Sequence, residues 1–354
     1  MLKRINKVRK SIMIGLTKNI GVSRINTKKN THASLKRILI NRPNHRLGNL
    51  LLVTPLVQEI KATFPDCKVD LFVKGGLAPI LFENYDNVDR IIKLPKKPFK
   101  ELVKYLKVWV KIKKHRYDMV INLDKDSSSG RLSTQFARAT NKIFGENIEE
   151  LENLYKDYRH MGKRPVYLFR HFIRLLGYKS SDLSVPPLDI KLSNEELFDG
   201  KKRLEELVSQ DKKTISIFTY ATGSKCYEEC WWDAYYGKLL EAFPDYNIVE
   251  ILPVENISKI GFKAPSFYSK DVREIAAVIA NTAVFIGADS GIMHLAASSQ
   301  APVVGLFSVT NPEKYEPYGN GSIAVDTNKV DLDENILLVK KILESRQPES
   351  LQYA

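Results

Sequence analysis

The chain alternates short apolar runs with longer segments in which apolar residues return every three or four positions. Short apolar runs are typical of strands buried in parallel sheets, and the longer spacing is typical of amphipathic helices. In the first half, the runs predict strands at residues 37–41, 68–73, 90–94 and 118–123. In the second half, they predict strands at residues 214–218, 247–252, 284–287 and 302–307.

Helical spacing fills several of the intervals between these predicted strands. We expect helices over residues 50–64, 99–117, 195–208, 272–280 and 334–343, and one more that begins at Ser290. Pro55 lies inside the first of these helices and predicts a kink, because proline removes a backbone donor and clashes with the preceding turn. Residues 185–188, which contain two prolines, interrupt the alternation and predict a connection between domains.

Strands that alternate with helices predict parallel sheets covered by helices. The sequence therefore predicts an α/β protein with two doubly wound lobes, whose ligands collect at the carboxyl ends of the strands. The predicted parts are a basic N-terminal arm at residues 1–35, lobes at residues 36–187 and 188–330, and a C-terminal helix and tail at residues 331–354.

The predicted helix over residues 99–117 separates apolar from basic positions. Its apolar positions predict a buried face made of Phe99, Leu102, Val103, Leu106, Trp109 and Val110. Its polar side carries Lys100, Lys104, Lys107, Lys111 and Lys114. These lysines are explained either by contact with anionic lipid or an acidic sugar acceptor, or by simple exposure to water.

The net charge of +14 is concentrated at one end of the chain. Residues 1–37 hold eleven of the 55 lysines and arginines and no acidic residue, so the other 44 basic residues nearly balance the 41 acidic ones. Apolar positions at helical spacing in the arm predict a basic amphipathic helix on an anionic membrane surface. A basic tail without a partner and a nucleic-acid contact are the alternatives, and the nearly neutral body argues against a nucleic-acid-binding enzyme.

The three cysteines, Cys67, Cys226 and Cys230, are too few for a disulfide framework and lack further ligands for zinc. They are typical of reduced thiols in a cytoplasmic protein. No apolar run approaches the roughly 20 residues needed to cross a bilayer, and no signal peptide is evident. The sequence therefore favours a protein that meets the membrane only at its surface.

An acidic turn follows the predicted strand 284–287 and leads into a helix of small and apolar residues. Asp289, Ser290 and Gly291 form this turn, and His294 follows in the helix. The first N–H groups of a helix have no helical partner and the helix dipole is positive there, so the turn predicts a site for an anion. The alternative is an ordinary helix cap, with Asp289 as the N-cap and His294 packed in the core.

A glycine-containing turn in the first half, Arg46-Leu47-Gly48-Asn49, leads into Thr54-Pro55. Together with Asp289-Ser290-Gly291 and His294-Leu295-Ala296, it resembles the motifs of glycosyltransferase family 9, the heptosyltransferase-like enzymes of lipopolysaccharide core assembly. The order and the spacing of the motifs match as well, and the resemblance extends over residues 36–327.

The resemblance implies the GT-B fold, two Rossmann-like lobes with a cleft between them. It implies that residues 188–330 bind a nucleotide-sugar donor, such as ADP-heptose, and that residues 36–187 bind the acceptor. The reaction would move a heptose to a lipopolysaccharide-core or related lipid-linked acceptor, with inversion and without a metal or other cofactor. The enzyme would work at the cytoplasmic face of the inner membrane of a Gram-negative bacterium.

Two alternatives stay open. A family member of the same fold would use a different UDP- or GDP-sugar donor. A non-catalytic homologue would bind a nucleotide sugar or a lipid without turnover.

The resemblance assigns the donor to one loop and one turn, with the residues Thr222, Gly223, Ser224, Lys225, Asp289, Ser290, Gly291 and His294. The N–H groups of Ser290 and Gly291 would hold the diphosphate, and Asp289 would orient the loop or a sugar hydroxyl. A hydroxyl and the ammonium group of the loop at residues 222–225 would neutralise the departing diphosphate. An ordinary surface loop is the alternative for these four residues.

Asn49 stands where the family usually has the aspartate that removes the acceptor proton. Asparagine is not a base, although it caps helices and hydrogen-bonds acceptors. Because losing a general base typically costs about 10²–10⁴ in rate, we expect another group of the same lobe, His45 or Asp126, to take this role. His45 titrates near neutral pH when unperturbed. The alternative is that both are solvated loop residues.

Arg46, Gly48 and Arg131 complete the acceptor side implied by the resemblance. Arg131 would meet an anionic acceptor, or else face water. Asp124-Lys125-Asp126 has the Asp-x-Asp pattern that holds a metal ion in a different glycosyltransferase fold. Because it lies in the lobe opposite the donor, we expect no metal there.

Overall fold

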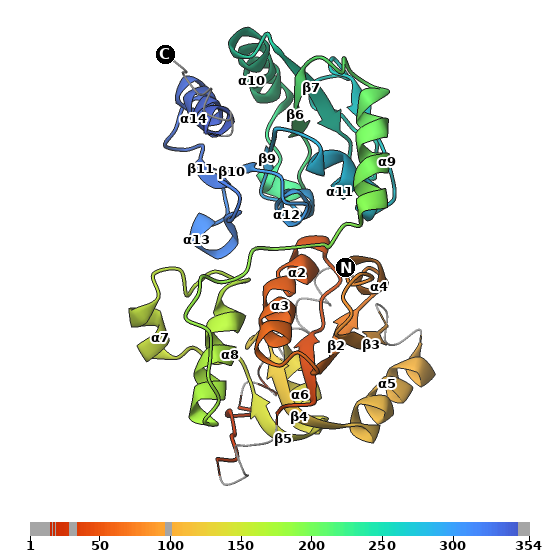
Figure 1. Cartoon of the computed structure of the whole chain (residues 1–354), viewed down its shortest axis with the longest axis vertical. Coiled ribbons are helices and arrows are strands. Elements are labelled where there is room, and N and C mark those ends of the chain that lie inside the picture. Colours follow the sequence, from red (N-terminus) through yellow and green to blue (C-terminus); the bar gives the residue numbers. More distant parts are fainter. Residues whose placement is uncertain (1–14, 16, 18, 28–33, 96–100, 346–354) are drawn as a thin grey trace, which may run out of the picture. The chain divides into compact units, whose positions relative to one another are not determined.

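The structure is a computed structural model, and Figure 1 shows its two parts. It describes residues 15, 17, 19–27, 34–95 and 101–345. The chain divides into two compact units, Met1–Pro186 and Pro187–Ala354, and the boundary falls between two adjacent prolines. The predicted fold class, two α/β lobes with parallel sheets, is confirmed.

The first unit is built on a parallel sheet with the strand order β3-β2-β1-β4-β5 (Figure 1). Its strands are β1 (Arg37–Arg42), β2 (Lys68–Lys74), β3 (Val88–Leu94), β4 (Arg116–Asn122) and β5 (Arg138–Ile143). Its helices are α2 (Leu47–Leu51), α3 (Thr54–Thr63), α4 (Ala78–Leu81), α5 (Leu102–Lys114), α6 (Ser128–Phe136), α7 (Glu149–Leu154) and α8 (Arg164–Leu175). The central strand β1 is buried from Ile38 onward, as expected where helices cover both faces of a parallel sheet.

The second unit is built on a parallel sheet with the order β11-β10-β9-β6-β7-β8. Its strands are β6 (Lys213–Phe218), β7 (Tyr246–Ile251), β8 (Ser266–Phe267), β9 (Val284–Ala288), β10 (Val303–Phe307) and β11 (Ile323–Asp326). Its helices are α9 (Asn194–Glu205), η2 (Gly223–Lys225), α10 (Glu229–Ala242), α11 (Val272–Ala280), α12 (Gly291–Ser298), α13 (Pro312–Tyr315) and α14 (Leu332–Glu344). Trp232 of α10 and Val339 of α14 are fully buried in its core, so the C-terminal helix is part of this unit.

Every predicted strand is confirmed, and no end is shifted by more than two residues. The helix predicted over residues 50–64 is instead two helices, α2 and α3. Leu52 and Val53 separate them, and Pro55 lies in the first turn of α3. Because the first N–H groups of a helix need no helical acceptor, proline at this position starts a helix rather than bending one.

The buried face predicted for residues 99–117 is wrong for four of its residues. Leu102, Val103, Leu106 and Val110 of α5 are exposed. The residues that pack against the sheet are Tyr105, Val108, Trp109 and Ile112. Trp109 belongs to the predicted face, whereas Phe99 lies outside the described residues.

The arm predicted at residues 1–35 lies largely outside the described residues. Its described part is attached to the first unit: the backbone of Arg24 exchanges two hydrogen bonds with Lys142 of β5, at 2.8 and 2.9 Å. The backbone N–H of Ser23 donates to Glu146 Oε1, and that of Asn26 donates to Asn141 Oδ1. Residues 23–26 therefore lie along β5.

Each sheet has a point at which the chain reverses its direction of strand addition. In the first sheet this point lies between β1 and β4, because the chain adds β2 and β3 on one side of β1 before β4 on the other. In the second sheet it lies between β6 and β9. Ligands of doubly wound sheets bind beyond the carboxyl ends of the strands at such a switch point.

Candidate functional site

The loop after β6 leaves its backbone open. Thr222, Gly223 and Ser224 are exposed, and Gly223 has a φ of +69°. A Cβ atom at Gly223 would meet no atom within 4 Å, so close neighbours do not explain this glycine. The left-handed backbone at this position explains why the residue is glycine, because residues with a Cβ atom adopt that conformation only with steric strain. The loop ends at Lys225, the last residue of η2.

Lys225 joins this loop to the turn after β9. Its Nζ lies 2.8 Å from Asp289 Oδ2 and 3.2 Å from the carbonyl oxygen of Asp289. Thr310 donates a second hydrogen bond to the same Oδ2, at 2.6 Å. The carboxylate is buried, with 6% of its side chain exposed, whereas the lysine side chain is 34% exposed. Asp289 therefore orients the loops, and the Lys225 side chain stays partly open to solvent.

The turn starts α12 with Ser290 as its N-cap, so the alternative that placed Asp289 at the cap is wrong. Ser290 Oγ accepts a hydrogen bond of 3.1 Å from the N–H of Met293. The N–H groups of Gly291 and Ile292 are in the first turn, where the helix offers no acceptor. They lie on the same turn as Asp289, which holds Lys225, and together these donors suit an anion.

His294 lies beneath this turn as a buried, neutral side chain. Burial lowers the pKa of His294 to about 4; the Asp289 carboxylate raises this pKa and the Lys225 ammonium lowers it. The imidazole ring contacts Tyr315 edge-on, with 6.3 Å between ring centroids. His294 therefore supports the turn as a packed, uncharged ring.

The switch point of the first unit carries a second pair of opposite charges, which sequence reasoning did not find. Arg42, the last residue of β1, donates to Asp124 Oδ2 at 3.0 Å and to Asn49 Oδ1 at 2.8 Å. Here the arginine side chain is buried, with 6% exposed, and the Asp124 side chain is 34% exposed. The only signal in the sequence is an arginine that ends an apolar strand.

The other acceptor-side residues predicted from the sequence lie around this pair. His45 and Arg46 are exposed in the loop between β1 and α2, and Gly48 is buried in α2. Asp126 is exposed, and its backbone N–H donates to Asp124 Oδ1 at 3.1 Å. The structure therefore brings Asn49 and Asp126 to Asp124, through Arg42 and through a loop hydrogen bond.

Arg131 does not face water, which corrects one of its two predicted roles. Its guanidinium is buried and donates to the hydroxyl of Thr17 at 2.8 Å and to the carbonyl of Lys125. The side chain thus ties the N-terminal segment to the loop that carries Asp124 and Asp126. Contact between Arg131 and an acceptor stays a prediction.

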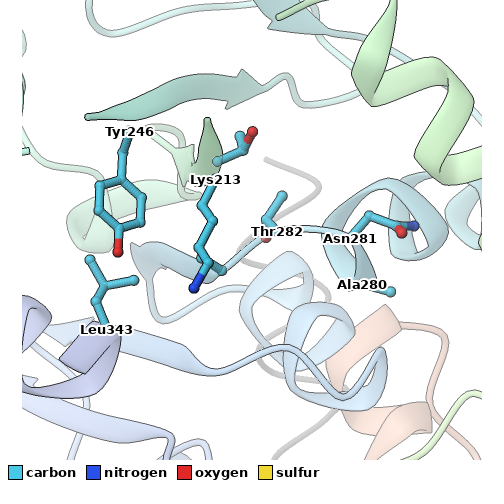
Figure 2. Close-up of a pocket in the computed structure, with 8 residues that line it drawn as sticks. Lys213, Tyr246, Ala280, Asn281, Thr282 and Leu343 are labelled. Carbon is cyan, nitrogen blue, oxygen red and sulfur yellow. The ribbon is translucent and has the colours of Figure 1, made fainter. Parts of the chain in front are cut away.

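A cavity of about 290 Å³ lies in the second unit, at the opposite edge of the sheet (Figure 2). Lys213, which begins β6, points into it beside Tyr246, the first residue of β7, and Thr282. Amino ends of parallel strands are not where doubly wound sheets bind ligands. Among the described residues, no cluster of three His, Cys, Asp or Glu side chains suits a metal ion.

Comparison with known proteins finds a family match around the second switch point. The sequence profile of glycosyltransferase family 9 (heptosyltransferase) matches residues 270–334, which include Asp289, Ser290 and Thr310. Lipopolysaccharide heptosyltransferase 3 of Escherichia coli is 24% identical over 302 residues, covering 78% of this chain and 85% of the relative. Lipopolysaccharide heptosyltransferase 1 of Campylobacter coli is 24% identical over 307 residues, covering 80% and 87%.

Solved structures agree with the fold. A family 9 glycosyltransferase from Veillonella parvula has a TM-score of 0.68 at 19% identity, covering 88% of this chain and 98% of that one. The E. coli heptosyltransferase WaaC with ADP has a TM-score of 0.61 at 17% identity, covering 87% and 99%. At these identities the structures bear on the fold alone.

The two doubly wound units have the GT-B fold of the solved heptosyltransferase structures, and a polar cluster lies at the switch point of each sheet. The predicted resemblance to glycosyltransferase family 9 is confirmed: the family profile matches residues 270–334, and relatives that align over most of the chain are lipopolysaccharide heptosyltransferases.

Proposed function

We propose that this enzyme transfers a heptose from ADP-heptose to the lipopolysaccharide core or a related lipid-linked acceptor, with inversion at the anomeric carbon. Its relatives are named as lipopolysaccharide heptosyltransferases, and one of the similar structures contains ADP. One observation carries the proposal: each switch point holds an ion pair, and the more exposed side chain of the pair is a lysine in the second unit and an aspartate in the first.

The second unit takes the donor. The diphosphate accepts hydrogen bonds from the Lys225 ammonium, from the hydroxyl groups of the open loop and from the first N–H groups of α12. Lys225 stays in place because the buried Asp289 carboxylate holds it, so it does not have to reorganise when charge develops on the departing diphosphate.

The first unit activates the acceptor. We assign the base to Asp124, whose partly exposed side chain is held by Arg42 and by the N–H of Asp126. Asn49 is no base, and it anchors the other branch of the Arg42 guanidinium. His45 and Asp126, the bases expected from the sequence, are exposed loop residues and become the candidates if Asp124 is dispensable.

The reaction is a single displacement. The acceptor oxygen forms a bond to the anomeric carbon as the bond from that carbon to the diphosphate oxygen breaks. The proton of the hydroxyl group passes to Asp124, and the bonding pair leaves with ADP. Attack from the face opposite the leaving group inverts the anomeric carbon.

We further propose that the enzyme works at the cytoplasmic face of the inner membrane, where a lipid-linked acceptor is accessible. The basic residues of the arm at residues 1–35 support this location through their charge. No helix of the described part of the chain is both long enough and apolar enough to span a membrane.

The test combines donor binding with turnover. ADP-heptose, UDP-sugars and GDP-sugars are added separately to the purified full chain, and the melting temperature is measured. Each donor is then incubated with the enzyme and heptose-deficient lipopolysaccharide, and products are weighed by mass spectrometry. We expect ADP-heptose alone to raise the melting temperature and to add one heptose. Stabilisation and transfer with a UDP- or GDP-sugar would instead establish the other-donor alternative.

A further inference from the structure

Helix α5 presents three separate faces along its thirteen residues. Successive residues of the helix are about 100° apart. One face packs against the sheet and consists of Tyr105, Val108, Trp109 and Ile112. The next face is apolar and exposed, and it consists of Leu102, Val103, Leu106 and Val110. We call these four residues the α5 strip. The third face consists of Lys104, Lys107, Lys111 and Lys114.

The α5 strip is exposed in addition to a separate face of the helix that already packs in the core. Trp109 fixes the helix by packing against Phe72 of β2 and Phe136 of α6, with centroid distances of 6.1 and 5.7 Å. The helix therefore already has a buried face, at the periphery of the first unit in Figure 1. The strip residues remain 54–69% exposed, which places a contiguous apolar surface in water.

The charge beside the strip has one sign. Residues Leu102–Lys114 contain five lysines and no acidic residue. Glu101, which precedes the helix, is paired with Lys104 at 2.8 Å. Lys113 lies over the exposed ring of Phe136, 5.8 Å from its centroid. At about 100° per residue it projects on the same side of the helix as the strip, one turn or less from its C-terminal end, so a further cation lies at the strip.

Phe198 of α9 provides a contrast within the same chain. Its side chain is as exposed as that of Val110, but its neighbours in sequence include Glu195, Glu196 and Asp199. A single apolar side chain among carboxylates is ordinary surface. The α5 strip differs from it in having several apolar residues on one face and lysines alongside.

We propose that the α5 strip docks on an anionic lipid bilayer, with its apolar side chains among the acyl chains and its lysines at the headgroups. Apolar residues beside a basic face are what interfacial helices use. A second copy of the chain fits poorly, because two lysine faces would repel each other. A nucleic acid would use the lysines but not the strip. The inference rests on α5 alone and goes beyond the proposed reaction.

The experiment measures sedimentation of the full chain with vesicles. One set contains phosphatidylglycerol and phosphatidylcholine, and the other contains phosphatidylcholine alone. The test variant is Val103→Asp/Val110→Asp, and the matched control is Phe198→Asp. A second variant, Lys107→Glu/Lys111→Glu, keeps the strip and reverses part of the charge. The arm is present in every protein, so differences among them report on α5.

We expect the wild type and Phe198→Asp to bind the anionic vesicles equally. Both α5 variants should lose about tenfold in partition coefficient, and Lys107→Glu/Lys111→Glu should also lose much of the salt dependence. Equal melting temperatures and circular dichroism spectra verify folding. Unchanged binding by Val103→Asp/Val110→Asp overturns the proposal. So does light scattering that finds a wild-type dimer which this variant abolishes, because the strip would then bind a second copy.

A failure of this test leaves heptose transfer untouched, because soluble donor binding does not involve α5. Conversely, an enzyme that uses another donor would still show the same loss of vesicle binding. The two proposals therefore fail separately.

Discussion

In the first unit Arg42 and Asp124 meet beyond β1 and β4, and in the second unit Lys225 and Asp289 meet beyond β6 and β9. The two pairs lie at corresponding positions of the two sheets, but the basic residue is the buried partner in the first unit and the acidic residue in the second. Arg42 and Asp289 are each 6% exposed, whereas Asp124 and Lys225 are each 34% exposed. The same ion pair thus presents a carboxylate in one unit and an ammonium in the other.

Under the proposed function, this difference would let one type of lobe serve two chemical tasks. A buried partner fixes the exposed group and limits its freedom, so the exposed group is preorganised for a ligand. The exposed carboxylate suits a hydroxyl group that must lose a proton, and the exposed ammonium suits a leaving group that gains negative charge. Under the proposed function, burial rather than residue type alone decides which charge would reach the substrate.

The largest expected effect comes from removing the exposed carboxylate. Asp124→Asn keeps the size of the side chain and an oxygen for Arg42, so the fold and donor binding should persist. The turnover number should fall about 10²–10⁴-fold, because the acceptor proton loses its base. Steady-state kinetics with lipopolysaccharide acceptor and thermal shift with donor measure the two effects. A full turnover number in this variant would return the role of base to His45 or Asp126.

A second substitution sharpens the same result. Asn49→Asp in the Asp124→Asn background supplies a new carboxylate on the other branch of Arg42. At least about tenfold of the lost rate should return if the position of the carboxylate beside Arg42 is what matters. Equal rates in the single and double variants would mean that only Asp124 reaches the acceptor.

Lys225→Met tests the positive charge at the switch point of the second unit. Removing a charged hydrogen-bond donor typically costs about 1.5–3 kcal/mol, so donor affinity should fall roughly 10- to 100-fold. Lys213→Met, in the cavity at the other edge of the sheet, is the matched control and should bind normally. Isothermal titration with ADP-heptose separates the two. Weak binding in both variants would point to a general electrostatic effect rather than a donor contact.

The smallest effect concerns His294, the buried ring beneath the second site. Its pKa is about 4 in the fold and about 6.5 when unperturbed, so the unfolded chain binds the proton first as the pH falls. The contribution of His294 to the free energy of unfolding is constant above pH 6.5. Below that pH it lowers the free energy of unfolding by up to about 1.4 kcal/mol per pH unit. Urea unfolding between pH 7.5 and about 5 should show a shallower loss for His294→Gln than for the wild type. Parallel curves would contradict this assignment.

Much of the fold could be predicted because buried parallel strands are apolar runs, and the helix expected at residues 272–280 has those bounds in the structure. Helix α10 escaped prediction because Trp231, Trp232, Tyr235 and Tyr236 are residue types that favour strands. On α5, two adjacent faces are apolar, and periodicity alone does not reveal which of them meets the sheet.

The second site was predictable in part, because Asp289, Ser290 and Gly291 are contiguous and form a recognisable turn. The pair Lys225–Asp289 joins residues 64 positions apart, and Arg42–Asp124 joins residues 82 apart. Which member of each pair is buried depends on tertiary packing. Arg42 gave only a weak local signal, since an arginine at the end of a strand is common on protein surfaces.

Arg131 connects Thr17, near the N-terminus, to the rest of the first unit through a hydrogen bond. Its guanidinium donates one hydrogen bond to the Thr17 hydroxyl and another to the carbonyl of Lys125, the residue after Asp124. Shortening the chain past Thr17 would remove a hydrogen-bond partner of a buried guanidinium and loosen the loop that carries Asp124, whereas a cut upstream of Thr17 would keep this contact.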